Sequence, residues 1–155
     1  MKKIILTLYF IGTITFANAE KDHHIPSYDL SHSLMQTIQD DAIIYGDGKK
    51  IIYVFIDPLC PYSRKFVTMV SKNPKMIEKY QYHFFLYSVP RLKSTDVVSA
   101  IYRSKTPMET LLNIMVEDKV QHDKNDPVTK ARVDRIEKVG KELHILKRPY
   151  IFIVM

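Results

Sequence analysis

A single cysteine, Cys60, is the residue best suited to nucleophilic chemistry in this 155-residue sequence. It lies in "FIDPLCPYSRKF" (55–66), where Pro61 follows it directly and Ser63 stands three positions further on. A thiolate is the nucleophile that attacks disulfides. A cysteine without a partner in its own chain is buried, paired with another molecule, or reactive.

The residues around Cys60 predict a strand that leads into a helix. The run 51–56 is almost continuously apolar and β-branched, as expected for a central strand buried on both faces. After the cysteine, apolar residues recur at helical spacing in "SRKFVTMVSK". We therefore expect the thiol at a helix N-terminus, where unpaired N–H groups and the charges of Arg64 and Lys65 favour a thiolate.

The first 19 residues are predicted to be a secretory signal peptide. "MKKIILTLYFIGTITFANAE" has two lysines, an apolar run over 4–17 and a small-residue site, so cleavage is expected before Glu20. The apolar run is shorter than the roughly 20 residues that a membrane-spanning helix needs. We expect a periplasmic protein without a membrane association after cleavage.

Composition excludes several other classes. The net charge of +6 includes the two lysines of the signal, and the remaining basic residues are scattered, so no nucleic-acid partner is expected. One cysteine rules out an internal disulfide framework. The candidate metal ligands lack a paired spacing, so we expect no metal site and no other cofactor. These ligands are His23, His24, His83, His122 and His144.

The rest of the chain alternates between predicted strands and helices. Residues 20–41 are read as a polar segment followed by a short helix with Leu30, Leu34 and Ile38 on one face. "AIIYGDGKKIIYVFID" predicts two strands joined by a hairpin turn. Further on, we expect a strand over 82–89, helices that begin near Ser94, Thr106 and Asp126, and a strand after Pro149. This order predicts an α/β fold with parallel pairing across the helical crossovers.

The strand, the Cys-Pro-Tyr-Ser sequence and the helix together resemble the active-site element of the thioredoxin superfamily, whose motif is Cys-x-x-Cys. Arg148-Pro149 before an apolar strand is similar to the cis-proline element of that superfamily. "KKIIYVFIDPLCPYSRKF" and the helical insertion over about 94–143 are most similar to the catalytic domain of DsbC/DsbG-type periplasmic disulfide isomerases. The resemblance implies a thioredoxin-like α/β domain over 42–155 with a helical insertion.

This resemblance also implies a role for each matching residue. Cys60 would be the attacking thiol, and Ser63 would occupy the resolving position. Pro149 would be a cis-proline that faces the thiol, and Arg148 would lie close enough to stabilise the thiolate. The substrate-binding residues that we expect are Pro61, Tyr62, Arg148 and Pro149.

The sequence departs from the resembled family in three ways. Ser63 cannot form an internal disulfide, so a substrate thiol or an external thiol would have to resolve any mixed disulfide. Residues 20–41 are too short for the dimerisation domain of the isomerases. The usual last strand and helix of the fold are also lacking, which would leave the strand over 150–154 as an exposed edge available for pairing.

Two kinds of function remain open from the sequence. The first is an exported monothiol protein that acts through Cys60 on thiols and disulfides, as an isomerase or reductase does. Its partners would be cysteine-containing exported proteins or a thiol reductant. The second is a non-catalytic binding protein or a truncated inactive paralogue of the same fold. Phosphatase and serine hydrolase chemistry are disfavoured, because the chain has only four glycines and no Gly-x-Ser-x-Gly element.

Overall fold

The structure is a computed structural model that describes residues 26–155. The predicted signal peptide, His23 and His24 lie outside the described residues. In the described part of the chain, no helix has the length and hydropathy needed to cross a membrane.

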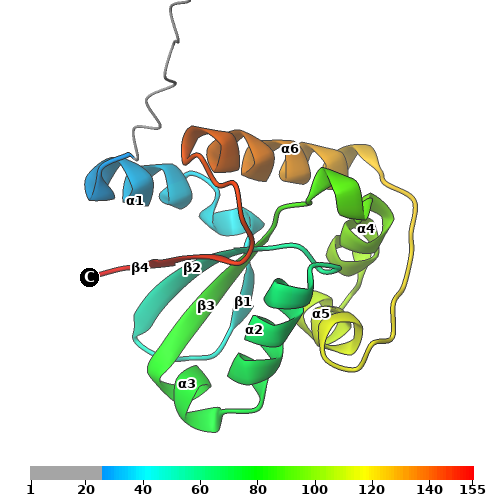
Figure 1. Ribbon diagram of the computed structural model, residues 1–155, viewed down its shortest axis with the longest axis horizontal. Coiled ribbons are helices and arrows are strands. Elements are labelled where there is room, and N and C mark those ends of the chain that lie inside the picture. Colours follow the sequence, from blue (N-terminus) through cyan, green and yellow to red (C-terminus); the bar gives the residue numbers. More distant parts are fainter. Residues whose placement is uncertain (1–25) are drawn as a thin grey trace, which may run out of the picture.

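A four-stranded sheet lies at the centre of the fold, with the strand order β1-β3-β2-β4 (Figure 1). The strands are β1 (Ile43–Tyr45), β2 (Lys50–Ile56), β3 (Tyr80–Leu86) and β4 (Tyr150–Ile153). β2 pairs with β3 in parallel, which confirms the predicted α/β arrangement for this crossover. β4 pairs with β2 in the antiparallel sense, so the expectation of parallel pairing is wrong there.

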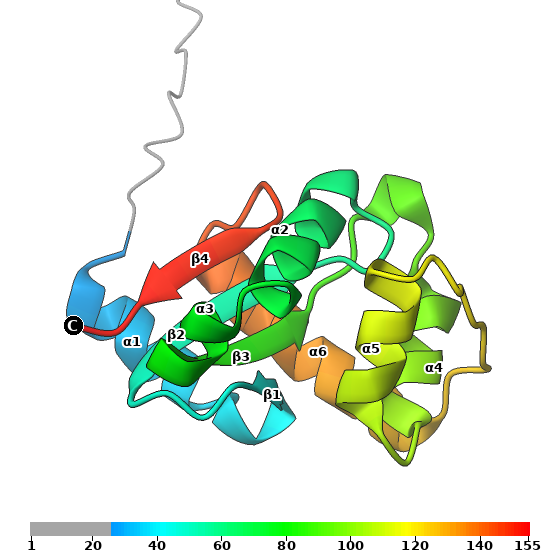
Figure 2. The same ribbon diagram turned by 90° about the horizontal axis from the view of Figure 1, so that it is seen from below.

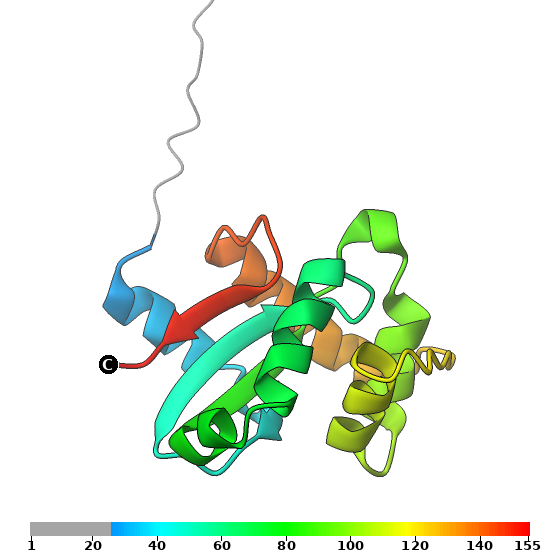
Figure 3. The same cartoon turned by 60° about the horizontal axis from the view of Figure 1, so that its bottom comes forward.

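Helices cover both faces of this sheet. They are α1 (Tyr28–Gln36), α2 (Pro61–Ser71), α3 (Pro74–Lys79), α4 (Thr95–Arg103), α5 (Pro107–Met115) and α6 (Pro127–Glu142), with short 3₁₀ turns η1 (Gln39–Asp41) and η2 (Pro90–Leu92). Figure 1 shows α1 and α6 on one side of the sheet and α2 with α3 on the other. The predicted helical insertion is present as α4, α5 and α6, between β3 and β4. Figures 2 and 3 show β4 at the outer edge of the sheet, next to the end of α1.

Aromatic side chains fill the core on each face of the sheet. Towards α2, the rings of Tyr82 and Phe84 stack with centroids 5.9 Å apart, and Phe66 meets Tyr82 edge-on. On the opposite face, Phe85 contacts both Tyr53 and Phe55, at 5.9 and 5.0 Å. Such pairs contribute about 0.5–1.5 kcal/mol each beyond the area that they bury. These contacts hold β2 and β3 in fixed positions, and therefore also position the segments that follow the two strands.

The predicted hairpin over Gly46-Asp47-Gly48 is wrong. β1 is antiparallel to β3 and not to β2, so the segment between β1 and β2 crosses the start of β3 instead of closing a hairpin. Both glycines are needed for this close crossing. An added Cβ at Gly48 would lie 2.1 Å from the backbone of Lys79, and Gly46 has φ +88. The same glycines that signal a hairpin locally serve a close backbone approach here.

Two predicted helix details also change. Of the predicted stripe, Ile38 is buried and Leu34 packs against the core, but Leu30 is 51% exposed. Ser31 and Met35 are also buried, so the buried face of α1 is rotated away from Leu30. Thr106 does precede α5, but its side chain makes no cap hydrogen bond. The predicted Asp126 cap of α6 is present, since its Oδ1 accepts from the Thr129 N–H at 2.8 Å.

A buried histidine in β3 makes the stability of the fold dependent on pH. His83 is 2% exposed, its Nδ1 has no hydrogen-bond partner in the described residues, and its ring meets the edge of Tyr53 at 5.4 Å. Its other ring nitrogen, Nε2, lies 3.0 Å from Gln81 Oε1. Burial lowers the pKa of His83 below its ordinary value of 6.5, because the charged imidazolium would lose its hydration.

We expect the free energy of unfolding to fall as the pH is lowered from 7 through the region below 6.5. There the unfolded chain binds a proton at this position and the folded chain does not, so protons favour unfolding. His83→Leu should flatten this part of the profile, measured by urea unfolding at pH 7, 6 and 5. His122→Gln, at an exposed histidine, is the control and should keep the wild-type slope. An unchanged slope in His83→Leu would contradict the assignment.

Candidate active site

Cys60 lies at the junction between β2 and α2. Its N–H donates to the Asp57 carbonyl at 3.0 Å, and its own carbonyl accepts from the Arg64 N–H at 2.9 Å, the first hydrogen bond of the helix. Pro61 occupies the first helical position, where its missing N–H costs nothing. The thiol thus stands at the positive end of the dipole of an 11-residue helix. Only 6% of the residue is exposed.

The thiol faces the segment that leads into β4. Cys60 Sγ donates to the main-chain carbonyl of Arg148 at 3.6 Å, across 88 positions of sequence. The Arg148–Pro149 peptide bond is cis. The antiparallel pairing of β4 with β2 brings this segment to the carboxyl end of β2, where the thiol stands.

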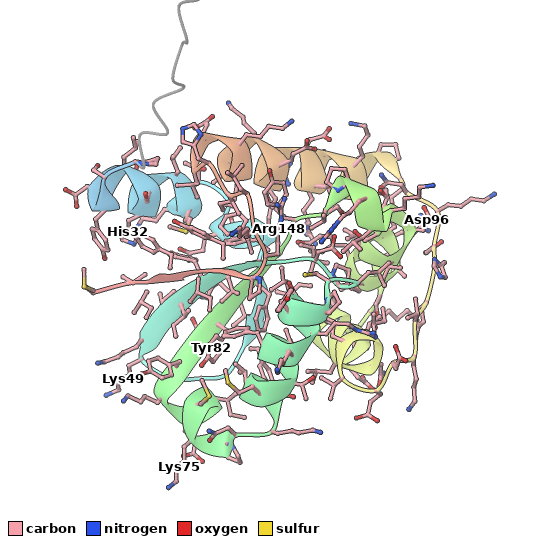
Figure 4. The ribbon with its side chains drawn as sticks, viewed as in Figure 1. His32, Lys49, Lys75, Tyr82, Asp96 and Arg148 are labelled. Atoms are coloured by element: carbon pink, nitrogen blue, oxygen red, sulfur yellow. The ribbon has the colours of Figure 1, made fainter. Side chains whose placement is uncertain are left out.

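The side chain of Arg148 is engaged by main-chain carbonyls. Its Nε donates to Tyr87 at 3.1 Å, Nη2 to Ser88 at 3.2 Å and Nη1 to Ile145 at 3.3 Å. The guanidinium also lies 3.6 Å from the ring centroid of Tyr87, and that ring packs closely on α6 at Gly140. Figure 4 shows Arg148 in the middle of the molecule, in contrast to Lys49 and Lys75 at its periphery. The atom of Arg148 that contacts the sulfur is therefore its carbonyl oxygen, while its guanidinium ties the end of β3 to the segment before β4.

Arg64 points towards the helical insertion. Its Nη2 donates to the carbonyl of Ile114 and forms an ion pair with Asp118 at 2.6 Å. Lys65 is exposed on the outer face of α2. The expected charge stabilisation of the thiolate by these two side chains therefore has no support in these contacts, and the helix N-terminus remains as the local source of positive potential.

Ser63 is fully buried below the thiol. Its Oγ accepts the Asp57 N–H at 3.3 Å, which fastens the first turn of α2 to the end of β2. A hydroxyl cannot form a disulfide, and the Ser63 Oγ instead accepts a hydrogen bond from the main-chain N–H of Asp57.

Asp57 is a site residue that the sequence reasoning missed. Its side chain is fully buried, yet each carboxylate oxygen is satisfied: Oδ1 accepts from the Leu59 N–H at 2.8 Å, and Oδ2 accepts from the Ser94 hydroxyl at 2.8 Å and from the Val89 N–H. The carboxylate thus holds the cysteine loop, the segment after β3 and the start of α4 together. An aspartate directly after a buried strand and before a proline is the signal that could have indicated this turn.

A cleft of about 640 Å³ opens beside the thiol. It is lined by Cys60, Tyr62, Val89, Arg91, Leu146, Lys147, Arg148 and Pro149. Four of the six predicted site residues are among these, whereas Ser63 lies buried below and Pro61 is exposed outside. The sequence reasoning missed the other four lining residues, although Leu146 and Lys147 directly precede Arg148-Pro149 and could have been found from that adjacency; the other two are Val89 and Arg91.

Comparison with known proteins identifies the family. Residues 39–154 match the family described as Thioredoxin-like domain, so the chain belongs to this family and the predicted resemblance to the thioredoxin superfamily is confirmed. A search among curated proteins found no match for this sequence.

Solved structures share the fold at low sequence identity. A disulfide interchange protein from Neisseria gonorrhoeae superposes with a TM-score of 0.58 and 18% identity, over 73% of this chain and 79% of that one. DsbG from Helicobacter pylori gives 0.62 and 16%, over 81% of this chain and 61% of that one. A periplasmic thioredoxin-like protein from Salmonella enterica serovar Typhimurium gives 0.59 and 11%, over 83% and 86%. Identities this low support the fold alone.

Proposed function

We propose that this protein is an exported monothiol protein that carries out thiol–disulfide exchange through Cys60 in the periplasm. The observation that carries the proposal is the position of Cys60: it is the residue at which α2 begins, its sulfur contacts the Arg148 carbonyl, and it lines an open cleft. The signal-like sequence of residues 1–19 supports export. Relatives of the same fold that are described as a disulfide interchange protein and as periplasmic agree with it.

The chemistry follows from a single thiol. The Cys60 thiolate attacks one sulfur of a substrate disulfide, a new Cys60–substrate disulfide forms, and the other substrate sulfur leaves as a thiolate. The sequence holds no second cysteine that could displace the bound substrate. A substrate thiolate that attacks the substrate sulfur of the mixed disulfide forms a new substrate disulfide and releases the Cys60 thiolate, which is isomerisation. A small thiol that attacks the Cys60 sulfur instead releases the substrate sulfur as a thiolate, and a second small thiol then frees Cys60 as the small molecule leaves as its disulfide. The second route oxidises two small thiols and reduces the substrate disulfide.

The test is the reactivity of Cys60 towards a small aromatic disulfide at pH 7. We expect the folded mature protein to react about tenfold faster than the same chain in urea, because the positive potential at the N-terminus of α2 stabilises the negative charge that is shared by the sulfurs during attack. Cys60→Ala should not react. A near-UV circular dichroism spectrum checks that the native samples, Cys60→Ala included, are folded and that the sample in urea is not. A folded thiol that reacts no faster than the unfolded one would overturn the proposal.

A second candidate function is binding without catalysis, through the edge of the sheet. Ile151 and Ile153 are 43% and 54% exposed on β4, whose outer side has no strand partner in residues 26–155. An exposed edge of this kind can accept a strand from another chain. Binding of this kind would persist in Cys60→Ala, which separates the two functions.

A further inference from the structure

We propose that the cleft beside Cys60 selects disulfides in which the reacting cysteine lies in an extended peptide with acidic neighbours. The inference rests on the proposed exchange function and names its substrate class. It is carried by the charges and the apolar side chains that line the cleft.

Three basic residues line the cleft, and none has an acidic partner among the described residues. Arg91 comes from η2, and Lys147 and Arg148 come from the segment before β4. Within residues 26–155, no carboxylate forms an ion pair with any of them. Basic side chains on the rest of the described surface do form such pairs; examples are Arg103 with Asp123 and Lys141 with Glu137. The Arg148 guanidinium is held by main-chain carbonyls and by the Tyr87 ring, so Arg91 and Lys147 carry the positive charge that is left for a ligand.

No acidic side chain of the described chain lines the cleft to cancel this charge. Asp57 lies behind the cysteine loop, but its side chain is fully buried, and both oxygens are occupied by the N–H and O–H donors described above. A carboxylate that enters the cleft would meet Arg91 and Lys147, both of which are exposed. The positive potential of the cleft would also stabilise the substrate thiolate that leaves during exchange. It would therefore raise the rate of the exchange step as well as the rate at which an acidic substrate meets the cleft.

The apolar side chains favour a peptide over a small anion. Tyr62 is 73% exposed and Leu146 is 75% exposed, and they come from separate segments, α2 and the connection between α6 and β4. Large apolar side chains that stand open at a cleft mark a binding surface. The cleft volume of about 640 Å³ lies within the range of roughly 300–1,000 Å³ in which proteins bind ligands. An extended peptide would cover both side chains while it places its cysteine against Cys60.

The experiment compares three peptides that differ only in charge. Each carries one cysteine as a 2-pyridyl disulfide, flanked by glutamate, glutamine or lysine, and Cys60 attack releases pyridine-2-thione, which is followed by absorbance. On the full mature chain at low salt, we expect the acidic peptide to react at least about tenfold faster than the basic one, with the neutral peptide between them. This ratio should shrink as salt is added. The doubly substituted chain with Arg91→Glu and Lys147→Glu should reverse the order.

A matched control and three further outcomes make the test decisive. Lys75→Glu makes the same kind of change on the periphery, away from the cleft, and should keep the wild-type order (Figure 4). Equal rates for the three peptides, each faster than with the unfolded chain, would overturn this inference and leave the exchange function standing. Rates no faster than those of the unfolded chain would overturn both. The 2-pyridyl mixed disulfide of glutathione serves as a small acidic disulfide with the same leaving group, and a rate above that of the acidic peptide would overturn the choice of a peptide.

Discussion

The Ser63→Cys variant is expected to form an internal disulfide with Cys60 and to behave as a dithiol protein. The two positions stand three residues apart at the start of α2, where side chains lie on one face with Cβ atoms about 5–6 Å apart. A disulfide needs a Cβ separation of roughly 3.5–4.5 Å, so a small shift of the first turn closes the bond. The buried Ser63 side chain already lies next to the cysteine loop, because its Oγ accepts from the Asp57 N–H.

The functional effect of this change should be large. In the present sequence a mixed disulfide at Cys60 waits for an external thiol, whereas the second thiol of the Ser63→Cys variant would displace the substrate from within the same molecule. We expect the lifetime of the mixed disulfide to fall on the order of 10²-fold or more, as intramolecular attack replaces a bimolecular step. Mass spectrometry of acid-quenched samples measures the mixed and internal disulfides directly.

Ser71→Cys is the matched control for Ser63→Cys. Ser71 is the last residue of the same helix, about 16 Å along the axis from Cys60, so the two thiols cannot pair in the folded protein. An internal disulfide in Ser71→Cys would mean that the chain had unfolded. Its absence in a folded Ser63→Cys protein would contradict the geometry described for the first turn of α2.

Asp57→Ala is expected to lower the free energy of unfolding by about 3–5 kcal/mol. The carboxylate accepts hydrogen bonds from the half-buried Leu59 and Val89 N–H groups and from the buried Ser94 hydroxyl, and its loss leaves all three donors without this partner. Each unsatisfied buried donor costs about 1–3 kcal/mol, and the total is a large share of the roughly 5–15 kcal/mol that stabilises a domain. Urea unfolding followed by circular dichroism measures the change.

Two milder variants show whether the carboxylate itself is responsible. Ser94→Ala removes one of the three donors and should cost about 1 kcal/mol. Asp57→Asn keeps the shape but turns one oxygen into a donor, so its cost should lie between those of the other two variants. A loss below about 1 kcal/mol for Asp57→Ala would refute the role assigned to this carboxylate.

The elements nearest Cys60 were predictable because their signals are local. The apolar run that became β2 and the helical spacing that became α2 each require only a short stretch of chain, and the turn between them places the thiol. The resemblance of Arg148-Pro149 to the cis-proline element predicted the part of the site that is far from Cys60 in the sequence. Four of the six predicted site residues line one cleft as a result.

The remaining features depend on contacts between distant segments. Gly46 and Gly48 locally predict a hairpin, but β3 lies between β1 and β2 in the sheet. The two glycines instead allow the connection from β1 to β2 to pass close to the backbone at the start of β3. The partners of Asp57 lie at three places in the chain, and only one of them is near in sequence. The guanidinium of Arg148 donates hydrogen bonds to three main-chain carbonyls, and no local sequence pattern predicts these partners.

The contact between the Cys60 sulfur and the Arg148 carbonyl spans 88 positions, which has a consequence for how the chain folds. β2 and β3 can pair early, because few residues separate them, whereas β4 must close a much longer loop before it docks on β2. Until that docking the thiol lacks its partner segment and stands open to solvent. In an oxidising compartment, folding would then compete with oxidation of the unshielded sulfur, and the rate at which β4 docks would set how much protein arrives with a usable thiol.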